Sequence, residues 1–407
     1  ILYMKENIFS KLSKIVNHFD TESLYLLLLL ITLVVSFLSN TTFMEYIPVK
    51  FLNRINYLVL FLLIVKIYVL DKYKVKSIIL ITGILTIAVF SWRITKVPSV
   101  MVMVVFILAA RNVNFDKIIK CYFNVNFLMV LLISLYAVAG VIKNLAYSRQ
   151  GIYRFSLGVD YPTDYAAYIF YLLLAYTYLN YRRLKTAHYI VFIAISISLY
   201  FITNARLDVI SILLIIPVVL ISKRAENKAN RISRIVASNY WSLSVILPYV
   251  YFLFTYYFNE ASKWFVKLNT LLSGRLAYGH KALEIYPIKL ISQHVKEQGW
   301  GGIAGAAVFH GDQSKYFFID SSYIRLLVIY GLVLTAFFVI VSVTISLRET
   351  IKHSYLLPSI ILLMTVSCLI DQHLMEITFN PFLLAFLANT TSETKIIKQG
   401  VKHGKTE

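Results

Sequence analysis

Five arginines lie in or beside the segments that separate apolar runs of the chain, and their side chains could bind phosphate groups. They are Arg149, Arg154, Arg206, Arg275 and Arg325. A planar guanidinium group binds phosphate or pyrophosphate through two parallel hydrogen bonds. Arg325 lies within an apolar run, where a charge is costly and by default is functional or specifically paired. These arginines therefore suit a pyrophosphate ligand at one face of a membrane.

Each cation taken alone also has a simpler interpretation. Arg149 and Arg154 could contact lipid headgroups, and Arg206 could pair with Asp208, two residues further on. Lys66 lies near one end of a predicted span, so we expect its side chain to reach the membrane surface. A binding role requires the arginines of separate segments to converge on one pocket.

The longest polar segment, residues 259–320, contains Gly274-Arg275, Glu284, a glycine-rich turn and Asp320. The spacing over residues 271–286 predicts an amphipathic helix that places Arg275, His280 and Glu284 broadly along one face. The histidines of the segment do not have the spacing of metal ligands, and no metal site is predicted. Asp320 precedes the next apolar run and is either a helix N-cap or a catalytic group.

The elements that must position these residues are membrane helices. The chain has 407 residues, of which 59% are hydrophobic and 15% are charged. Soluble proteins carry about 25% charged residues, so a polytopic helical membrane protein is predicted. The net charge of +20 comes from lysines and arginines in short loops, which argues against nucleic-acid binding. The chain has no Walker or Rossmann motif, so nucleotide-driven chemistry is not expected.

We predict about twelve transmembrane helices, since a span needs about 20 mostly apolar residues. They lie at roughly 24–39, 51–70, 77–92, 94–110, 121–142, 164–180, 188–203, 207–222, 241–258, 321–346, 356–370 and 374–390. The last two could instead form a re-entrant pair around Asp371-Gln372-His373.

The distribution of lysine and arginine predicts cytoplasmic termini and an extracytoplasmic 259–320 segment. The predicted organisation is nine spans in 1–258, the large loop at 259–320, three spans in 321–390 and a cytoplasmic tail at 391–407. The first span is expected to act as its own signal.

Several of these motifs resemble those of Wzy-type polysaccharide polymerases, which build capsule, exopolysaccharide and O-antigen chains. Ser273-Gly-Arg-Leu, Gly279-His and the Asp320-Ser-Ser-Tyr-Ile-Arg run are similar to the large-loop-to-span signature of that family. Arg154-Phe-Ser-Leu-Gly is similar to its earlier outer loop, and Asn204-Ala-Arg to an arginine turn shared with O-antigen ligases. The arginine-to-glycine spacing of some Gram-negative members is not clear in this chain.

The resemblance implies an all-helical fold of the GT-C type with a cleft that opens outward. The implied reaction transfers a growing glycan from one undecaprenyl pyrophosphate onto the repeat unit carried by another, without metal, cofactor or nucleotide sugar. Arg206 and Arg275, with the other three arginines, would stabilise the departing pyrophosphate. The acceptor hydroxyl needs a general base, for which Asp320 is the first candidate and Glu284 and His280 are the alternatives.

The expected partners are the lipid-linked donor and acceptor glycans, membrane lipids, a chain-length regulator and a flippase, and the expected location is the plasma membrane. Two other functions remain open at this point. An O-antigen-ligase-like glycosyltransferase would share the architecture but use another acceptor. A flippase for lipid-linked oligosaccharides would fit the number of spans, although the single long outer loop and the clustered arginines favour an enzyme. A purely structural membrane protein would leave Arg325 and the Gly274-Arg275 helix without a role.

Overall fold

The computed structural model describes residues 20–227 and 230–390. The predicted cytoplasmic tail at 391–407 lies outside the described residues, and so does the N-terminal end before residue 20. The predicted location of the two termini therefore falls on residues that are not described. Within them the fold is all-α apart from one two-stranded hairpin. The prediction of an all-helical protein is therefore confirmed.

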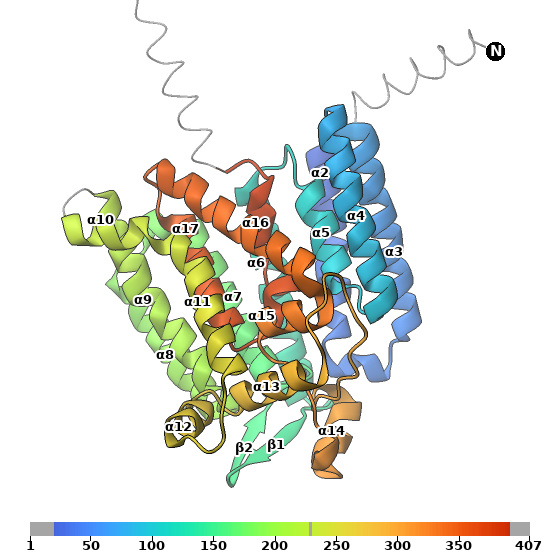
Figure 1. The fold of residues 1–407 in the computed structure, drawn as a ribbon, viewed down its shortest axis with the longest axis vertical. Coiled ribbons are helices and arrows are strands. Elements are labelled where there is room, and N and C mark those ends of the chain that lie inside the picture. The colour runs from blue at the N-terminus through green and yellow to red at the C-terminus, as the bar shows by residue number, and fades with distance from the viewer. Residues whose placement is uncertain (1–19, 228–229, 391–407) are drawn as a thin grey trace, which may run out of the picture.

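The helices form a bundle that is drawn with its long axis vertical in Figure 1. The first part of the chain contributes α2 (Thr21–Ser39), α3 (Val49–Val65), α4 (Val75–Thr95), α5 (Ser99–Ala109), α6 (Phe115–Val138), α7 (Pro162–Asn180), α8 (Thr186–Thr203) and α9 (Arg206–Glu226). The second part contributes α10 (Arg231–Ser238), α11 (Tyr240–Tyr256), α12 (Lys263–Leu271), α13 (Arg275–Ile285), α14 (Gly302–His310), α15 (Ser322–Arg325), α16 (Gly331–Ile351) and α17 (Leu356–Cys368).

Short helical turns join or follow several of these helices. They are η1 (Thr42–Glu45), η2 (Lys66–Leu70), η3 (Tyr181–Arg183), η4 (Gln313–Lys315), η5 (Leu326–Tyr330), η6 (His373–Met375) and η7 (Phe382–Phe386). Two of them, η2 and η5, are π-helical turns that continue α3 and α15.

Six helical segments of the described residues are long and apolar enough to cross a membrane, which indicates a multi-pass membrane protein. They are Thr21–Ser39, Val49–Leu70, Val75–Thr95, Phe115–Val138, Thr186–Thr203 and Ser322–Ile351. By length and composition, the prediction of about twelve spans is therefore wrong.

The other predicted spans fail for identifiable physical reasons. The helices α5 and α17 have only 11 and 13 residues, which at 1.5 Å per residue is too short for a bilayer. α9 carries charges at both ends, α7 is rich in tyrosine and α11 has 17 residues with an internal proline. The segment predicted as the span 374–390 forms only the short turns η6 and η7 in the described structure, and most of its side chains are buried.

The path after α17 corresponds to the alternative prediction of a re-entrant pair. α17 begins where the Tyr355 amide donates to Glu226 at the end of α9. The chain turns at 371–373, and Asn389 then exchanges backbone hydrogen bonds with Val113 and Phe115 at the start of α6. The segment thus enters and leaves at one end of the bundle and places its polar turn in the interior.

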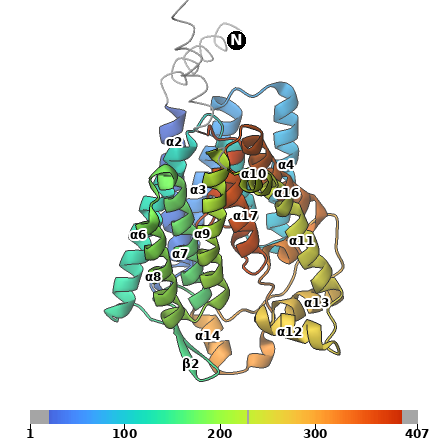
Figure 2. The ribbon, with the colours of Figure 1, turned by 90° about the vertical axis from the view of Figure 1, so that its left-hand side faces the viewer.

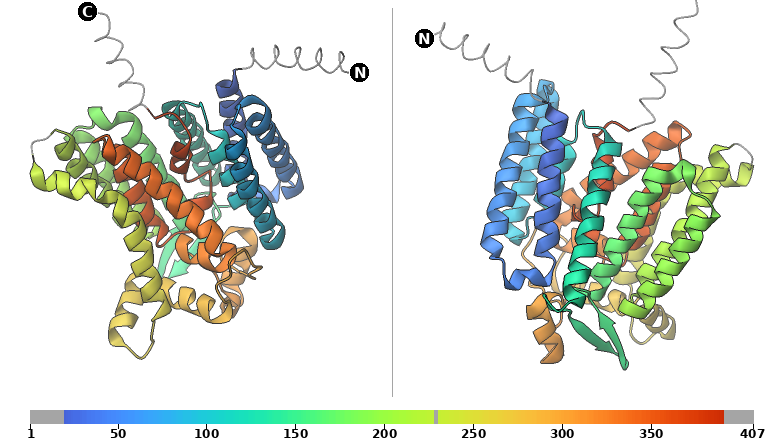
Figure 3. Two further views of the ribbon diagram at one scale, coloured as in Figure 1. Left: turned by 45° about the horizontal axis from the view of Figure 1, so that its top comes forward. Right: turned by 180° about the vertical axis from the view of Figure 1, so that it is seen from behind.

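The opposite end of the bundle carries α12, α13, α14 and the hairpin, as Figures 1 and 2 show, and we call it the cavity end. The views in Figure 3 agree that these elements lie together beyond the ends of the long helices. Most of the 259–320 segment therefore folds against the bundle at this end. The residues predicted to form its amphipathic helix contain α13, whose Gly279 packs against α11, because an added Cβ would lie 2.8 Å from Thr255.

The hairpin pairs β1 (Ala146–Arg149) with β2 (Ile152–Phe155). Its turn residues Gln150 and Gly151 have φ values of 52° and 79°, as a tight two-residue hairpin turn requires. Tyr147 lies opposite Arg154, and Arg149 lies opposite Ile152. Because alternate residues of a strand share a face, Arg149 and Arg154 lie on the same face of the hairpin.

Residues 287–293 are hydrogen-bonded into the break between α15 and α16. The Gln293 amide donates to Ile329 and the Leu332 amide donates to Lys289, at 2.9 and 3.0 Å. Gly331 has a φ of 82°, and a Cβ there would come within 2.7 Å of the Ile291 backbone. Glycine is therefore required where the loop backbone approaches the broken helix.

Lys66 does not reach a membrane surface as expected. Its side chain is 0% exposed and its ammonium group lies 2.7 Å from the carboxylate of Asp71. The ammonium also donates to the carbonyl groups of Ala109 and Arg111. The charge is thus paired within the fold, at the end of α6 opposite to the hairpin.

Candidate functional site: two cavities with a common wall

Three of the predicted arginines line one cavity of about 470 Å³, which we call the cationic cavity. Arg149 and Arg154 come from the hairpin and Arg275 from the start of α13. Asp320 lies in the same lining, together with tyrosines of several segments. Guanidinium groups from separate parts of the chain therefore converge on one pocket.

The two hairpin arginines have no carboxylate within ion-pair distance among the described residues. Arg154 is 5% exposed, donates from Nε to the Thr203 carbonyl at 2.8 Å and lies over the ring of Tyr161. Burial and then repulsion from Arg154, Arg206 and Arg275 lower the pKa of Arg149. Like charges held together without compensation favour the binding of an anion.

Arg275 is positioned by a left-handed turn. Ser273 and Gly274 have φ values of 59° and 88°, and α13 starts directly after them. The Arg275 side chain is 10% exposed and pairs with Asp371 at 3.3 Å. Its Nε also donates to the carbonyl of Ile370. Arg275 thus joins the 259–320 segment to the polar turn that follows α17.

The remaining two arginines do not line the cationic cavity. Arg206 is exposed at the start of α9, and its contact is with the Asn204 side chain at 3.3 Å rather than with Asp208. Arg325 is held by Glu297 at 2.5 Å and by the Ile319 carbonyl. The charge of Arg206 still acts on Arg149, whereas Arg325 is an internal ion pair.

Asp320 lines both cavities of the site. It does not cap the following helix, because Ser321 occupies the N-cap position. Burial raises the pKa of Asp320 to about 6, an effect that Arg275 opposes and Asp371 reinforces. At neutral pH this carboxyl group is mostly ionised and can accept a proton.

The two alternative base candidates lie away from the cavities. His280 contacts the Thr255 carbonyl at 3.0 Å and Glu284 at 3.4 Å, on the side of α13 that faces α11. The Glu284 side chain is exposed. Neither residue is brought together with Asp320 or with the arginines.

A second cavity of about 350 Å³, which we call the acidic cavity, adjoins the first. It is lined by five carboxylate side chains and by one histidine, namely Asp160, Asp164, Glu297, Asp320, Glu376 and His373. The two cavities share the lining residues Tyr161, Thr163, Trp300, Tyr316 and Asp320. The shared wall makes them neighbouring parts of a single site.

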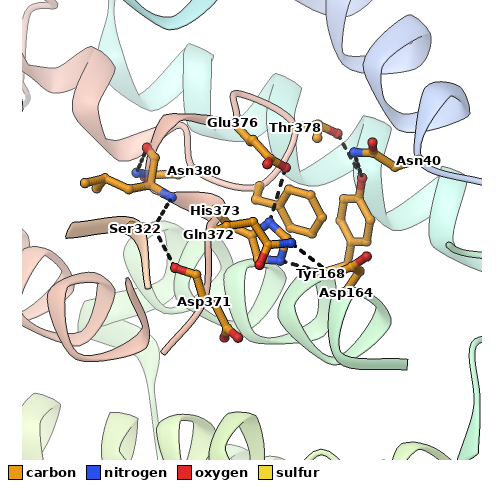
Figure 4. Close-up of polar contacts among 12 residues, drawn as sticks. Asn40, Asp164, Tyr168, Ser322, Asp371, Gln372, His373, Glu376, Thr378 and Asn380 are labelled. Carbon is orange, nitrogen blue, oxygen red and sulfur yellow. Dashed lines mark hydrogen bonds and ion pairs between the residues drawn. The ribbon is translucent and has the colours of Figure 1, made fainter. Parts of the chain in front are cut away.

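His373 forms the centre of the polar cluster drawn in Figure 4. Its ring lies between Asp164 at 3.4 Å and Glu376 at 3.2 Å, and it stacks on Phe379 with 3.7 Å between ring centroids. Burial lowers the pKa of His373, but Glu376 and Asp164 outweigh burial and raise the pKa to about 10. The cluster therefore holds one cation between two carboxylates at neutral pH.

Asp160 is the least compensated of these acids. Burial, followed by repulsion from Asp164, raises its pKa to about 7. Its backbone carbonyl accepts from the Gly302 amide at 2.9 Å. A Cβ at Gly302 would lie 3.4 Å from the Asp160 carboxylate, so the glycine-rich turn packs closely against this acid.

The sequence contained a signal for the acidic cavity that was not used. Asp371, Gln372, His373 and Glu376 interrupt an otherwise apolar segment, and ionisable residues in such a segment are functional candidates by default. Asp160 and Asp164 flank Tyr-Pro-Thr at the start of α7, with Asp164 in its first turn, but could not be linked to this cluster by spacing. Across residues 20–227 and 230–390, no group of three or more acidic, histidine or cysteine side chains is arranged to hold a metal ion.

Comparisons with protein-family models, curated proteins and solved structures found no match for this chain.

Proposed function

We propose that the protein is a membrane glycosyltransferase of the Wzy type, with a GT-C-like arrangement of helices, that joins lipid-linked oligosaccharide repeat units. The observation that carries the proposal is the cationic cavity, where two arginines of the hairpin and one of α13 lie beside Asp320. The acidic cavity across the common wall supplies a place for a second substrate. A transferase needs such a pair of adjoining subsites, one for each reactant.

The cationic cavity suits the departing group. In the proposed reaction the bond between the donor sugar and its phosphate oxygen breaks, and undecaprenyl pyrophosphate leaves with the electron pair. Arg149, Arg154 and Arg275 stabilise the charge that develops on this oxygen. The guanidinium groups of Arg154 and Arg275 are already held by backbone carbonyls and need little rearrangement at the moment of reaction.

Asp320 suits the role of general base. It accepts the proton of an acceptor hydroxyl while that oxygen forms the new bond to the donor sugar carbon. Its position in both linings places it between the donor and the acceptor, as this step requires. Glu284 and His280 have no part in the proposal because they line neither cavity.

The proposal places the cavity end outside the plasma membrane. Substrates would be donor and acceptor glycans on undecaprenyl pyrophosphate, delivered by a flippase, and a chain-length regulator would be a further partner. Membrane lipids surround the apolar helices, and an anionic substrate accounts for the three arginines of the cationic cavity on the outer side, where basic residues are otherwise fewer.

The decisive experiment measures the length of lipid-linked glycans in a strain that lacks the chain and is complemented with variants. We expect Arg149→Ala and Asp320→Asn to leave single repeat units on the outer face of the membrane. Arg93→Ala is the matched control, because Arg93 is an exposed arginine in the last turn of α4 that lines neither cavity. It should sustain full-length polymer.

Three results would contradict the proposal. Full-length polymer in the Arg149 and Asp320 variants would show that the cavities are not the reaction site. Single units that accumulate on the cytoplasmic face would instead indicate a flippase. Normal chain length combined with loss of transfer to a final, non-repeat acceptor would indicate a ligase.

A further inference from the structure

The acidic cavity has more carboxylates than cations to balance them. Glu297 is neutralised by Arg325 at 2.5 Å. His373 supplies one positive charge for both Asp164 and Glu376. Asp160 has no cationic partner among the described residues. With Asp320 partly offset by Arg275, the cavity remains net negative at neutral and higher pH.

Aromatic side chains form much of the remaining lining. Trp300 and Tyr316 pack with 4.1 Å between ring centroids, in the wall common to both cavities. Phe318 and Phe379 line the acidic cavity from other segments. The indole N–H of Trp300 has no hydrogen-bond partner within the described part of the chain. A buried donor of this kind favours a ligand that brings an acceptor oxygen.

Aromatic faces combined with carboxylate acceptors suit one chemical class of ligand. A sugar ring presents apolar C–H faces together with hydroxyl groups, which donate to carboxylates. The volume of about 350 Å³ lies within the range of small-molecule sites and accommodates one or two sugar rings. The negative lining repels an anion, whereas the cationic cavity next to it attracts one.

On the basis of the proposed function, we propose that the acidic cavity is the acceptor subsite and selects a neutral sugar ring over one that carries a carboxylate. The difference in charge between the two cavities then also determines which part of the substrates binds in which cavity. Pyrophosphate is excluded from the acidic side and is held on the arginine side, so the reacting acceptor hydroxyl approaches Asp320 from the acidic cavity.

The test uses the purified full chain in detergent and soluble glycosides as probes. Binding of methyl glucoside, methyl galactoside and methyl N-acetylglucosaminide is compared with binding of methyl glucuronide and methyl galacturonide by saturation-transfer NMR at pH 8. We expect at least one neutral glycoside to bind about tenfold more tightly than its uronic counterpart, because one uncompensated charge at short range has an effect of this order.

Two variants and one control locate the effect. Asp160→Asn removes one negative charge with little change of shape. It should reduce the ratio of affinities for neutral and uronic glycosides severalfold. Ala304→Phe should abolish binding of every probe, because Ala304 is exposed and lines the acidic cavity. Glu260→Gln removes an exposed carboxylate remote from both linings and should leave the preference unchanged.

The inference is overturned if no neutral glycoside binds, if uronides bind equally well, or if Ala304→Phe leaves binding intact. An equal change of preference in Asp160→Asn and Glu260→Gln would also overturn it, since the selectivity would then come from overall charge. Because these measurements need no lipid-linked glycan, their failure is separate from a failure of the polymerisation assay.

Discussion

Lys66 and Arg149 are both cations that are shielded from solvent, but within the described part of the chain only Lys66 is paired with a carboxylate. Lys66 is fully buried, and its ammonium group is bound by Asp71 and by two backbone carbonyls. Arg149 lies among other arginines, and its pKa is lowered by burial and by their charges. A buried charge that is paired with a carboxylate contributes to the stability of the fold. Like charges that lie close together without a counterion instead favour the binding of an anionic ligand.

Arg275 and Arg325 fall between these extremes and refine the distinction. Both are ion-paired and nearly buried, but only Arg275 lines one of the two cavities described above. Pairing alone therefore does not separate a structural arginine from a binding one. What distinguishes them is whether the guanidinium group borders space that a substrate can occupy.

The largest effect is expected for Arg275→Ala. The rate of glycan lengthening should fall about 10³-fold, because the variant loses a donor to the leaving group. It also leaves the buried Asp371 unpaired, which costs about 3–5 kcal/mol of stability. Glycan length and thermal unfolding of the purified protein separate the two effects. Arg275→Lys, which keeps the charge, should recover most stability but little activity, and a well-folded Ala variant with normal polymer would contradict the prediction.

Asp320→Asn should lower the rate about 10²-fold with the protein fully folded. The amide keeps the shape of the side chain but cannot accept the acceptor proton. The measurement is the initial rate of lengthening of lipid-linked repeat units by purified protein. Asp312→Asn, at an exposed carboxylate of the same end, is the comparison, and equal losses in both variants would count against a specific role.

The pH dependence should follow the carboxyl group of Asp320. Its pKa is raised to about 6, so its basic form is lost as the pH falls through that value. The rate should therefore drop about tenfold per pH unit below about 6 and level off above it. Rates in a series of buffers between pH 5 and 8 test this. A flat profile in the wild type, or the same profile in Asp320→Asn, would exclude Asp320 as the base.

Arg206→Ala should have a smaller effect than its position in the sequence suggested. From the sequence alone Arg206 was expected, together with Arg275, to stabilise the departing pyrophosphate. The structure places Arg206 in an exposed position outside the lining, where water and salt screen its charge. We now expect about a threefold to tenfold increase in the donor concentration needed for half-maximal rate. Complete loss of polymer would show that Arg206 enters the site when substrate binds.

Asp71→Asn should not change the rate per folded molecule. It leaves the Lys66 charge buried without its counterion and should lower stability by about 3–5 kcal/mol. Thermal unfolding in detergent, followed by activity of the surviving protein at lower temperature, checks both parts. A loss of activity without a loss of stability would contradict the distinction between the ion-paired Lys66 and the arginines of the cationic cavity.

The sequence predicted the helical fold and part of the candidate site. Arg149, Arg154, Arg275 and Asp320 were selected by residue type and by their place outside apolar runs, and the structure brings these four together. Their geometry could not be predicted, because a hairpin face and a left-handed turn decide which guanidinium groups meet.

The final part of the chain was mispredicted because composition does not distinguish a membrane helix from a buried irregular segment. Residues 374–390 are apolar enough for a span, but Pro381 and the asparagine before it disfavour a continuous helix. Asn380 instead bonds the Leu374 carbonyl. The His373 cluster depends on this turn and on contacts with residues more than two hundred positions away, for which the sequence has no local pattern.

The loop inserted at Gly331 has a mechanical consequence. Backbone hydrogen bonds join residues 287–293 to η5 and to α16, on the two sides of the break at Gly331. This segment is therefore fixed in place and cannot move as a lid. The cavity residues Glu297 and Trp300 follow this segment directly in the chain, so their backbone is anchored at one end. Under the proposed function, substrate would enter beside this fixed segment, and a larger side chain at position 331 would displace the segment without contacting a sugar.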